Sequence, residues 1–204
     1  RTELPFSVSL KKYTPLLYPQ VNSTCVAHSF ANARTILYAK QLNYTDKNKI
    51  TGLSFSPYYI YYRNKDAGDI ECKTGLSIET AARDVLNNGI APMIEVEYPN
   101  YYPFTVNALC SENKGTSYPP SMAKDLEVAK KYKIDMIYRV VTIGGLKTAL
   151  ASGMPVILCM YAPESFNKLK GNIWIPQLTD KIEKKNGHAL IAVGYDDNKY
   201  GGAI

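Results

Sequence analysis

The spacing of apolar residues changes along this chain, and that change is what most constrains its fold. In residues 25–41 apolar side chains recur every three or four positions, which is typical of a helix with one core-facing side. Shorter helices are expected at 57–63, after the capping residue Ser56, and at 77–87, between Ser77 and the stop signal Gly89. The core-facing stripe of the long helix is predicted to consist of Val26, Phe30, Ala33 and Leu37.

The second half of the chain has the patterns of strands. Residues 134–141 alternate between apolar and polar, while 155–161 and 188–195 are short apolar runs rich in β-branched residues. A short helix is expected at 146–152, and residues 98–120 are predicted to be loop-rich. Because helices come first and strands later, the sequence predicts an α+β protein with a helical lobe and a sheet lobe.

Cys25 stands where a polar stretch runs into the long helical pattern, so its thiol is expected in the first turn. There the unpaired backbone N–H groups and the helix dipole favour a negative charge, which helps to form a thiolate. His188 stands at the mouth of a strand far downstream. A cysteine and a histidine in this arrangement are typical of a nucleophile and its base, brought together by folding.

The other histidine, His28, is an alternative base, because it follows Cys25 by three residues on the same helix. Two side chains so close on one rigid helix leave little room for a substrate carbonyl between them. We therefore favour His188 as the base and expect His28 to lie at the interface of the two lobes.

Composition excludes several classes of function. The net charge of +6 is spread along the chain rather than gathered in a basic stripe, so we expect no nucleic-acid partner. No apolar run approaches the roughly 20 residues that a membrane-spanning helix needs. With two histidines and no zinc-like cysteine spacing, we expect no metal and no other cofactor.

Three cysteines remain besides Cys25. Cys159 falls in an apolar strand and is expected to be a small buried side chain. Cys72 and Cys110 lie in loop-like segments and are able to pair, which would suit an oxidising compartment.

Several motifs occur in the order seen in the papain-like cysteine peptidases. They are Leu4-Pro5, Gln20, Cys25-Val26-Ala27, Thr74-Gly75-Leu76-Ser77, Ser152-Gly153-Met154-Pro155-Val156, and Asn186-Gly187-His188-Ala189 through Val193-Gly194-Tyr195. The chain resembles this family over nearly its whole length, and its divergent bacterial branch most of all. The resemblance implies one domain over residues 1–204, with a mainly helical lobe at 13–112 and a mainly β lobe at 113–204. Residues 1–12 would cross to the β lobe, whose sheet would be antiparallel, and the active site would lie in the cleft between the lobes.

The resemblance also implies a function, that of a secreted or otherwise extracytoplasmic thiol endopeptidase acting on peptide or protein substrates. Cys25 would form a thioester intermediate, and His188 would act as acid and base. The Gln20 side chain and the Cys25 backbone N–H would stabilise the oxyanion, while Gly75, Leu76 and Gly187 would bind substrate. A pro-segment or a protein inhibitor would be a further partner.

Departures from the family pattern leave alternatives open. Val26 replaces the usual tryptophan, and the asparagine that orients the family's histidine would be expected just beyond Ile204. The 204-residue chain by itself is therefore expected to be poorly active. The alternative is a catalytically impaired homologue that acts as a peptide-binding or interaction module; a third possibility is an amidase or acyltransferase acting on a non-protein amide. Trp174 is expected to pack in the core or pin a loop rather than line the cleft.

Overall fold

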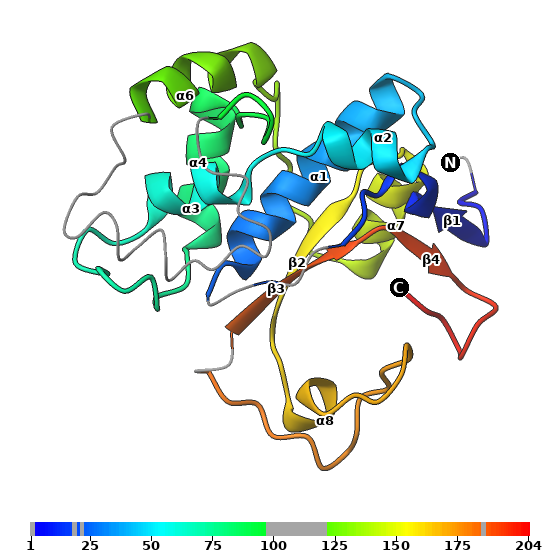
Figure 1. Cartoon of the computed structure of the whole chain (residues 1–204). Coiled ribbons are helices and arrows are strands. Elements are labelled where there is room, and N and C mark those ends of the chain that lie inside the picture. Colours follow the sequence, from blue (N-terminus) through cyan, green and yellow to red (C-terminus); the bar gives the residue numbers. More distant parts are fainter. Residues whose placement is uncertain (1–2, 18–19, 21–22, 97–121, 185–186) are drawn as a thin grey trace.

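The computed structural model describes residues 3–17, 20, 23–96, 122–184 and 187–204. In Figure 1, helix α1 lies at the centre, helices α3, α4 and α6 lie on one side of it, and strands β2 and β3 pass close to its N-terminal half. The helices are α1 (Cys25–Gln41), α2 (Lys47–Gly52), α3 (Pro57–Asn64), α4 (Ile78–Asn88), α6 (Met122–Ala129), α7 (Ile143–Ala151) and α8 (Glu164–Asn167), with short 3-10 helices η1 (Lys11–Tyr13) and η2 (Lys130–Tyr132).

Helix α1 has the bounds that the sequence predicts, and it begins at Cys25. Its buried face is wider than the predicted stripe: Val26 and Phe30 are buried as expected, but Ala33 and Leu37 are only half-buried. The reason is that α1 packs against α3 and also against strand β3. Neighbours on more than one side bury further small or apolar side chains of α1, namely Ala27, Ala31, Ile36 and Ala39.

Local capping signals fix the other two predicted helices of the first half to within a residue. The Ser56 hydroxyl accepts a hydrogen bond from the Tyr59 backbone N–H at the start of α3. Ser77 does the same for Thr80 at the start of α4. Gly89 ends α4 with a φ of 78°, in the left-handed region that glycine adopts without strain.

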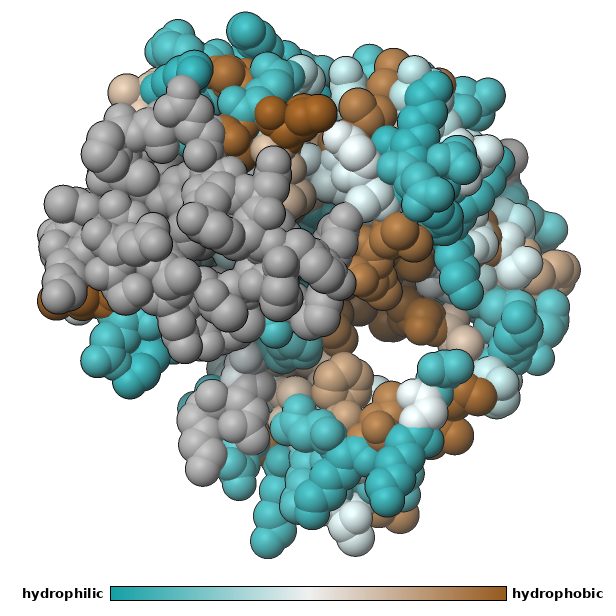
Figure 2. Space-filling model, in the orientation of Figure 1, coloured by the Kyte–Doolittle hydropathy of each residue, from teal (hydrophilic) through white to brown (hydrophobic). Residues whose placement is uncertain are grey.

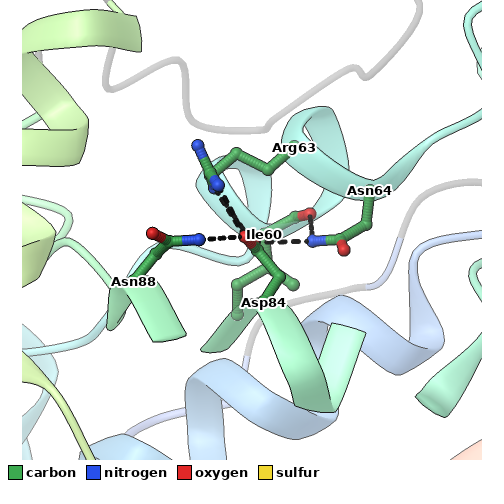
Figure 3. Close-up of polar contacts among 5 residues, drawn as sticks. All are labelled: Ile60, Arg63, Asn64, Asp84 and Asn88. Atoms are coloured by element: carbon green, nitrogen blue, oxygen red, sulfur yellow. Dashed lines mark hydrogen bonds and ion pairs between the residues drawn. The ribbon is translucent and has the colours of Figure 1, made fainter. Parts of the chain in front are cut away.

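A half-buried polar cluster joins α3 to α4 (Figure 3). The Asp84 carboxylate accepts hydrogen bonds from Arg63 Nη2 at 2.5 Å and from Arg63 Nε at 2.9 Å. It also accepts from Asn64 Nδ2 at 3.1 Å and from Asn88 Nδ2 at 2.6 Å. One carboxylate thus serves three donor side chains, so the cluster holds the two helices in a fixed relation.

The described strands form two antiparallel pairs. Strand β2 (Val156–Tyr161) pairs with β3 (Gly187–Ala192), and β1 (Ser7–Ser9) pairs with β4 (Gly194–Asp196). The single strand predicted at 188–195 is therefore divided at Val193. Its carbonyl accepts a hydrogen bond from the Leu10 backbone N–H at 2.6 Å, at the point where the chain changes partner from β2 to β1.

The strand predicted at 134–141 is wrong, since these residues form no strand in the structure. Met136, Tyr138 and Val141 are exposed. Alternation favours a strand only where a neighbouring strand supplies hydrogen bonds, and no strand in the described part of the chain pairs with this segment. The helix predicted at 146–152 instead begins at Ile143, because the Thr142 hydroxyl caps it by accepting from the Gly145 N–H.

Two clusters of buried side chains make up the core. The first gathers side chains of α1, α3, α4 and the start of β3, including the four tyrosines of α3. The second gathers the far end of α1 with α7, β2 and β4. The α+β fold class predicted from the sequence is thus confirmed; the lobe boundaries stay a prediction, and the segment predicted as loop at 98–120 lies outside the described residues.

The segment between β2 and β3 leaves the rest of the molecule and returns to it. It carries α8, and Figure 2 shows a hollow between this segment and the sheet, bordered by hydrophobic residues. No helix among the described residues has the length and apolar character that crossing a membrane requires.

Candidate active site

Cys25 is the first residue of α1, so its thiol sits among the backbone N–H groups that open the helix. The side chain is half-buried. One of these groups, the backbone N–H of Val26, forms a hydrogen bond that lowers the pKa of the Cys25 thiol, though its effect is the smallest of several. The sequence predicted this position, because the change from polar to helical pattern falls at Cys25.

His188 is the second residue of β3, opposite Met160 of β2. Because α1 packs on β3, the thiol of Cys25 and the imidazole of His188 meet. The pKa of Cys25 lies below its ordinary value, and the largest cause is the hydrogen bond with the His188 side chain. Burial opposes this shift, while a backbone hydrogen bond from Ala189 and the charge of His188 support it. The arrangement therefore favours the thiolate form of Cys25.

Cys159 is the second free thiol near this site. The prediction that it is buried is wrong, since the residue is exposed. It lies directly opposite Ala189 in the β2–β3 pair. Partial burial raises the pKa of the Cys159 thiol, and the charge of Cys25 raises it further. Cys159 is thus the less ionised of the two thiols.

His28 occupies a different environment from His188. It is 8% exposed, and its ring meets that of Tyr58 edge-on at 6.2 Å. Burial lowers the pKa of His28 to about 4, so the ring is neutral at pH 7. His28 borders a cavity of about 20 Å³, whose lining residues all fall in the predicted helical lobe: His28, Asn32, Ser54, Phe55, Pro57, Tyr58 and Met93. The prediction that His28 lies between the lobes is therefore not confirmed.

Two of the predicted substrate-binding residues, Gly75 and Leu76, lie in the loop before α4, close to the segment that enters α1. A Cβ added to Gly75 would come no closer than 4.0 Å to Ser23, two residues before Cys25. The Ser23 hydroxyl donates to the Lys73 carbonyl at 2.7 Å, so this loop is tied to the segment that enters α1. Leu76 is buried in the core beside α1.

Gly187 and Gln20 are both exposed. Gly187 opens β3 immediately before His188, and a Cβ there would meet nothing within 4 Å. The structure thus places an open backbone beside the imidazole. The roles assigned to Gln20, Gly75, Leu76 and Gly187 stay predictions.

Sequence reasoning missed Phe166. Its ring lies 6.2 Å from that of His188, centroid to centroid, with the two planes tilted by 53°. Phe166 also contacts Trp174, whose ring meets it edge-on with the two centroids 5.3 Å apart. Trp174 is half-buried, and its Nε1–H donates to the Ser165 hydroxyl at 3.0 Å within the same segment, as expected of a residue that pins a loop. Phe166 belongs to a four-residue helix with no periodic pattern, so little in the sequence distinguishes it.

Cys72 is disulfide-bonded, while Cys25 and Cys159 are free. Cys110, the partner expected for Cys72, lies outside the described residues. Among the residues that the structure describes, no group of three or more His, Cys, Asp or Glu side chains is placed to hold a metal ion.

Solved structures with a similar fold are cysteine proteases. The chain aligns over 96% of its length with 71% of xylellain, a cysteine protease from Xylella fastidiosa, at a TM-score of 0.69 and 23% identity. It aligns over 97% of its length with 79% of bromelain from Ananas comosus, solved with the inhibitor E64, at a TM-score of 0.62 and 18% identity.

A third similar structure is the proform of Amb a 11, a cysteine protease and ragweed pollen allergen, at a TM-score of 0.63 and 21% identity. The chain spans 53% of that proform. No protein-family model matches the chain, and no curated protein matches it. The chain therefore has the papain-like α+β fold of these cysteine proteases, as the sequence predicted.

Proposed function

We propose that this chain is a thiol endopeptidase, in which Cys25 attacks the peptide bond and His188 acts as acid and base. The observation that carries the proposal is the contact of these two side chains, which lowers the pKa of the thiol. A thiolate is the nucleophilic form of cysteine, and an adjacent imidazole is the group that most often activates it.

In the first step the Cys25 thiolate adds to the carbonyl carbon of the peptide. The oxyanion that forms accepts hydrogen bonds from the Cys25 backbone N–H and the Gln20 side-chain amide. The tetrahedral intermediate then collapses, the C–N bond breaks, and His188 gives its proton to the departing amine. The acyl group stays on Cys25 as a thioester.

In the second step a water molecule attacks the thioester. His188, now neutral, takes a proton from that water, and the C–S bond breaks to release the carboxylic acid. The proton remains on His188 and the thiolate is restored, so the pair returns to its starting state. Gly75 and Gly187 have no side chains, so an extended substrate backbone can approach close to the reacting atoms on both sides.

We also propose a location outside the cytoplasm and a further partner. The disulfide at Cys72 supports a location outside the cytoplasm, where oxidising conditions keep such bonds formed. Similar structures have been solved as a proform and with E64 bound, so we propose a pro-segment or an inhibitor as a further partner.

The direct test is covalent labelling by E64, an inhibitor bound by the similar protease bromelain. We expect one label per chain, read by intact mass, and loss of labelling in Cys25→Ser and in His188→Ala. Cys159→Ser is the matched control, because it removes the other free thiol among the residues that the structure describes and should label as the wild type does. Unlabelled wild-type protein would favour the alternative of a peptide-binding module.

Labelling does not distinguish a peptidase from an amidase. Incubation with a mixed peptide library, analysed by mass spectrometry, separates the two functions. Cleavage at internal peptide bonds, absent in Cys25→Ser, supports the endopeptidase; labelling without any cleaved peptide would favour an enzyme that acts on a non-protein amide.

A further inference from the structure

The segment between β2 and β3 has little hydrophobic core of its own. Ile173, Ile175, Leu178 and Ile182 are all exposed on it. The segment borders the Cys25–His188 site. Its residues can hold the side chains of that site in place only if other contacts fix the segment itself.

The best-defined contact inside the segment is between two aromatic rings. Trp174 and Phe166 meet at 90° with their centroids 5.3 Å apart, the edge-to-face geometry that aromatic pairs favour. Because both rings are half-buried, each restricts the other. The position of Phe166 thus depends on that of Trp174.

Trp174 is in turn fixed by a chain of hydrogen bonds. Its Nε1–H donates to the Ser165 hydroxyl at 3.0 Å, and that hydroxyl donates to Asp180 Oδ2 at 2.8 Å. The Gln177 backbone N–H donates to the same carboxylate oxygen at 2.8 Å. These hydrogen bonds from Ser165 and Gln177 hold the pKa of Asp180 below its ordinary value, so the carboxylate is ionised and remains an acceptor.

The far end of this assembly contacts His188. The Phe166 ring lies 6.2 Å from the imidazole. Within the part of the chain that the structure describes, the His188 side chain forms a hydrogen bond with Cys25 and a ring contact with Phe166. An imidazole needs such a second contact, because a single hydrogen bond leaves its ring free to turn.

We propose that Phe166 is a positioning residue: its ring, held by Trp174 and through Ser165 by Asp180, keeps the His188 imidazole turned toward Cys25. This inference rests on the proposed function of the Cys25–His188 pair and adds a residue that orients the imidazole. Phe166 touches neither the substrate carbonyl nor the thiol in this role; it acts through His188.

The test is the pH dependence of Cys25 alkylation by iodoacetamide in the full chain, measured by peptide mapping in a Cys159→Ser background, which removes the other free thiol of the described residues. Wild-type Cys25 is expected to react rapidly at pH 6, where only about one part in 300 of an ordinary thiol is ionised. In Phe166→Ala the rate at pH 6 is expected to fall by about tenfold or more, because the imidazolium no longer faces the sulfur.

At pH 9.5 the thiol is ionised without help, so the rates of wild type and Phe166→Ala are expected to agree within about twofold. This selective loss distinguishes positioning from general damage to the fold, which would change the rate at both values of pH. Phe166→Tyr keeps the ring and should restore the rate at pH 6. Glu164→Gln is the matched control, since Glu164 is an exposed residue of the same helix.

The outcomes separate the two proposals. If wild-type Cys25 titrates as an ordinary thiol, the proposed function is overturned. If wild-type Cys25 reacts at pH 6 and Phe166→Ala keeps the same profile, the proposed function stands and the positioning role is overturned. Equal losses in Phe166→Tyr and Phe166→Ala would also overturn it, because the ring would then not be what matters.

Discussion

Cys159 of β2 lies directly opposite Ala189 of β3, and the backbone N–H of Ala189 forms a hydrogen bond with the thiol of Cys25. Two free thiols therefore border the same residue of β3. Their pKa values move in opposite directions, since that of Cys25 is lowered by His188 and that of Cys159 is raised by partial burial and by the charge of Cys25.

This difference predicts selective chemistry at Cys25. With iodoacetamide at pH 7 we expect Cys25 to be alkylated first, followed much more slowly by Cys159, although Cys159 is the more exposed residue. Peptide mapping by mass spectrometry at successive times measures the two rates. In Cys25→Ser the rate at Cys159 should rise, because the neighbouring charge is gone; equal rates at both thiols in the wild type would contradict the prediction.

His28 predicts a loss of stability in acid. Its pKa is about 4 in the folded chain and 6.5 when unperturbed, so between these values the unfolded state binds the proton that the folded state does not. The contribution of His28 to the free energy of unfolding is fully present above pH 6.5. As the pH falls toward 4, that free energy declines by about 3 kcal/mol because of this group. Urea unfolding of wild type and His28→Phe at pH 7 and pH 4.5 measures it: the variant should lose markedly less, and parallel losses would contradict the prediction.

The carboxylate that joins α3 to α4 predicts a large effect on folding. Asp84→Ala removes the acceptor shared by Arg63, Asn64 and Asn88; breaking a fully buried ion pair costs about 3–5 kcal/mol, and we expect a cost of up to that size for this half-buried cluster. The free energy of unfolding from urea titration measures this cost. The exposed Glu164–Lys168 pair gives the matched control, since Glu164→Gln should change that free energy by less than about 1 kcal/mol.

We predict that no side chain is tolerated at position 89. A Cβ on this residue would collide with the backbone carbonyl of Ala129, and its φ of 78° disfavours other residues. We expect Gly89→Ala to lower the thermal unfolding midpoint strongly. Gly52→Ala, in open space at the end of α2, should leave it unchanged or raise it, because alanine reduces the freedom of the unfolded chain. Similar effects of the two changes would refute the steric argument.

Gln20 predicts a change of rate without a change of stability. If its amide donates to the oxyanion, Gln20→Ala lowers kcat/KM by roughly 10²–10³ and leaves the unfolding midpoint unaltered, because the residue is exposed. Cleavage of a fluorogenic peptide gives the rate. Gln41→Ala, an exposed amide at the other end of α1, is the control; an unchanged rate in Gln20→Ala would exclude Gln20 from the oxyanion site.

The helices could be predicted from the sequence because their ends are set by neighbours in the chain. Ser56, Ser77 and Gly89 each act within a few residues, through a capping hydrogen bond or a left-handed φ, and the helices that they bound are present. The start of α1 at Cys25 was predicted from the change of pattern at that residue and not from a capping side chain, since Thr24 makes no side-chain capping hydrogen bond there. The sequence therefore located the thiol at a helix N-terminus without any knowledge of the fold.

Strands and the surroundings of the thiol depended on distant residues. The alternation at 134–141 indicated a strand, but a strand exists only where another pairs with it, and the segment 188–195 divided at Val193 because two different strands pair with it. Cys159 is exposed for a similar reason, since burial depends on what packs over a strand and not on its own apolar pattern.

The sequence by itself determined the kinds of group available: one thiol at the start of a helix and one imidazole at the start of a strand, 163 positions apart along the chain by the difference of their numbers, 188 − 25. Only the tertiary structure decided that α1 packs on β3 so that the two meet, and that the Phe166 ring contacts the imidazole. The physical reason is range: capping and helix dipoles act within a turn of backbone, whereas the pKa of Cys25 depends on a contact that exists only in the packed chain.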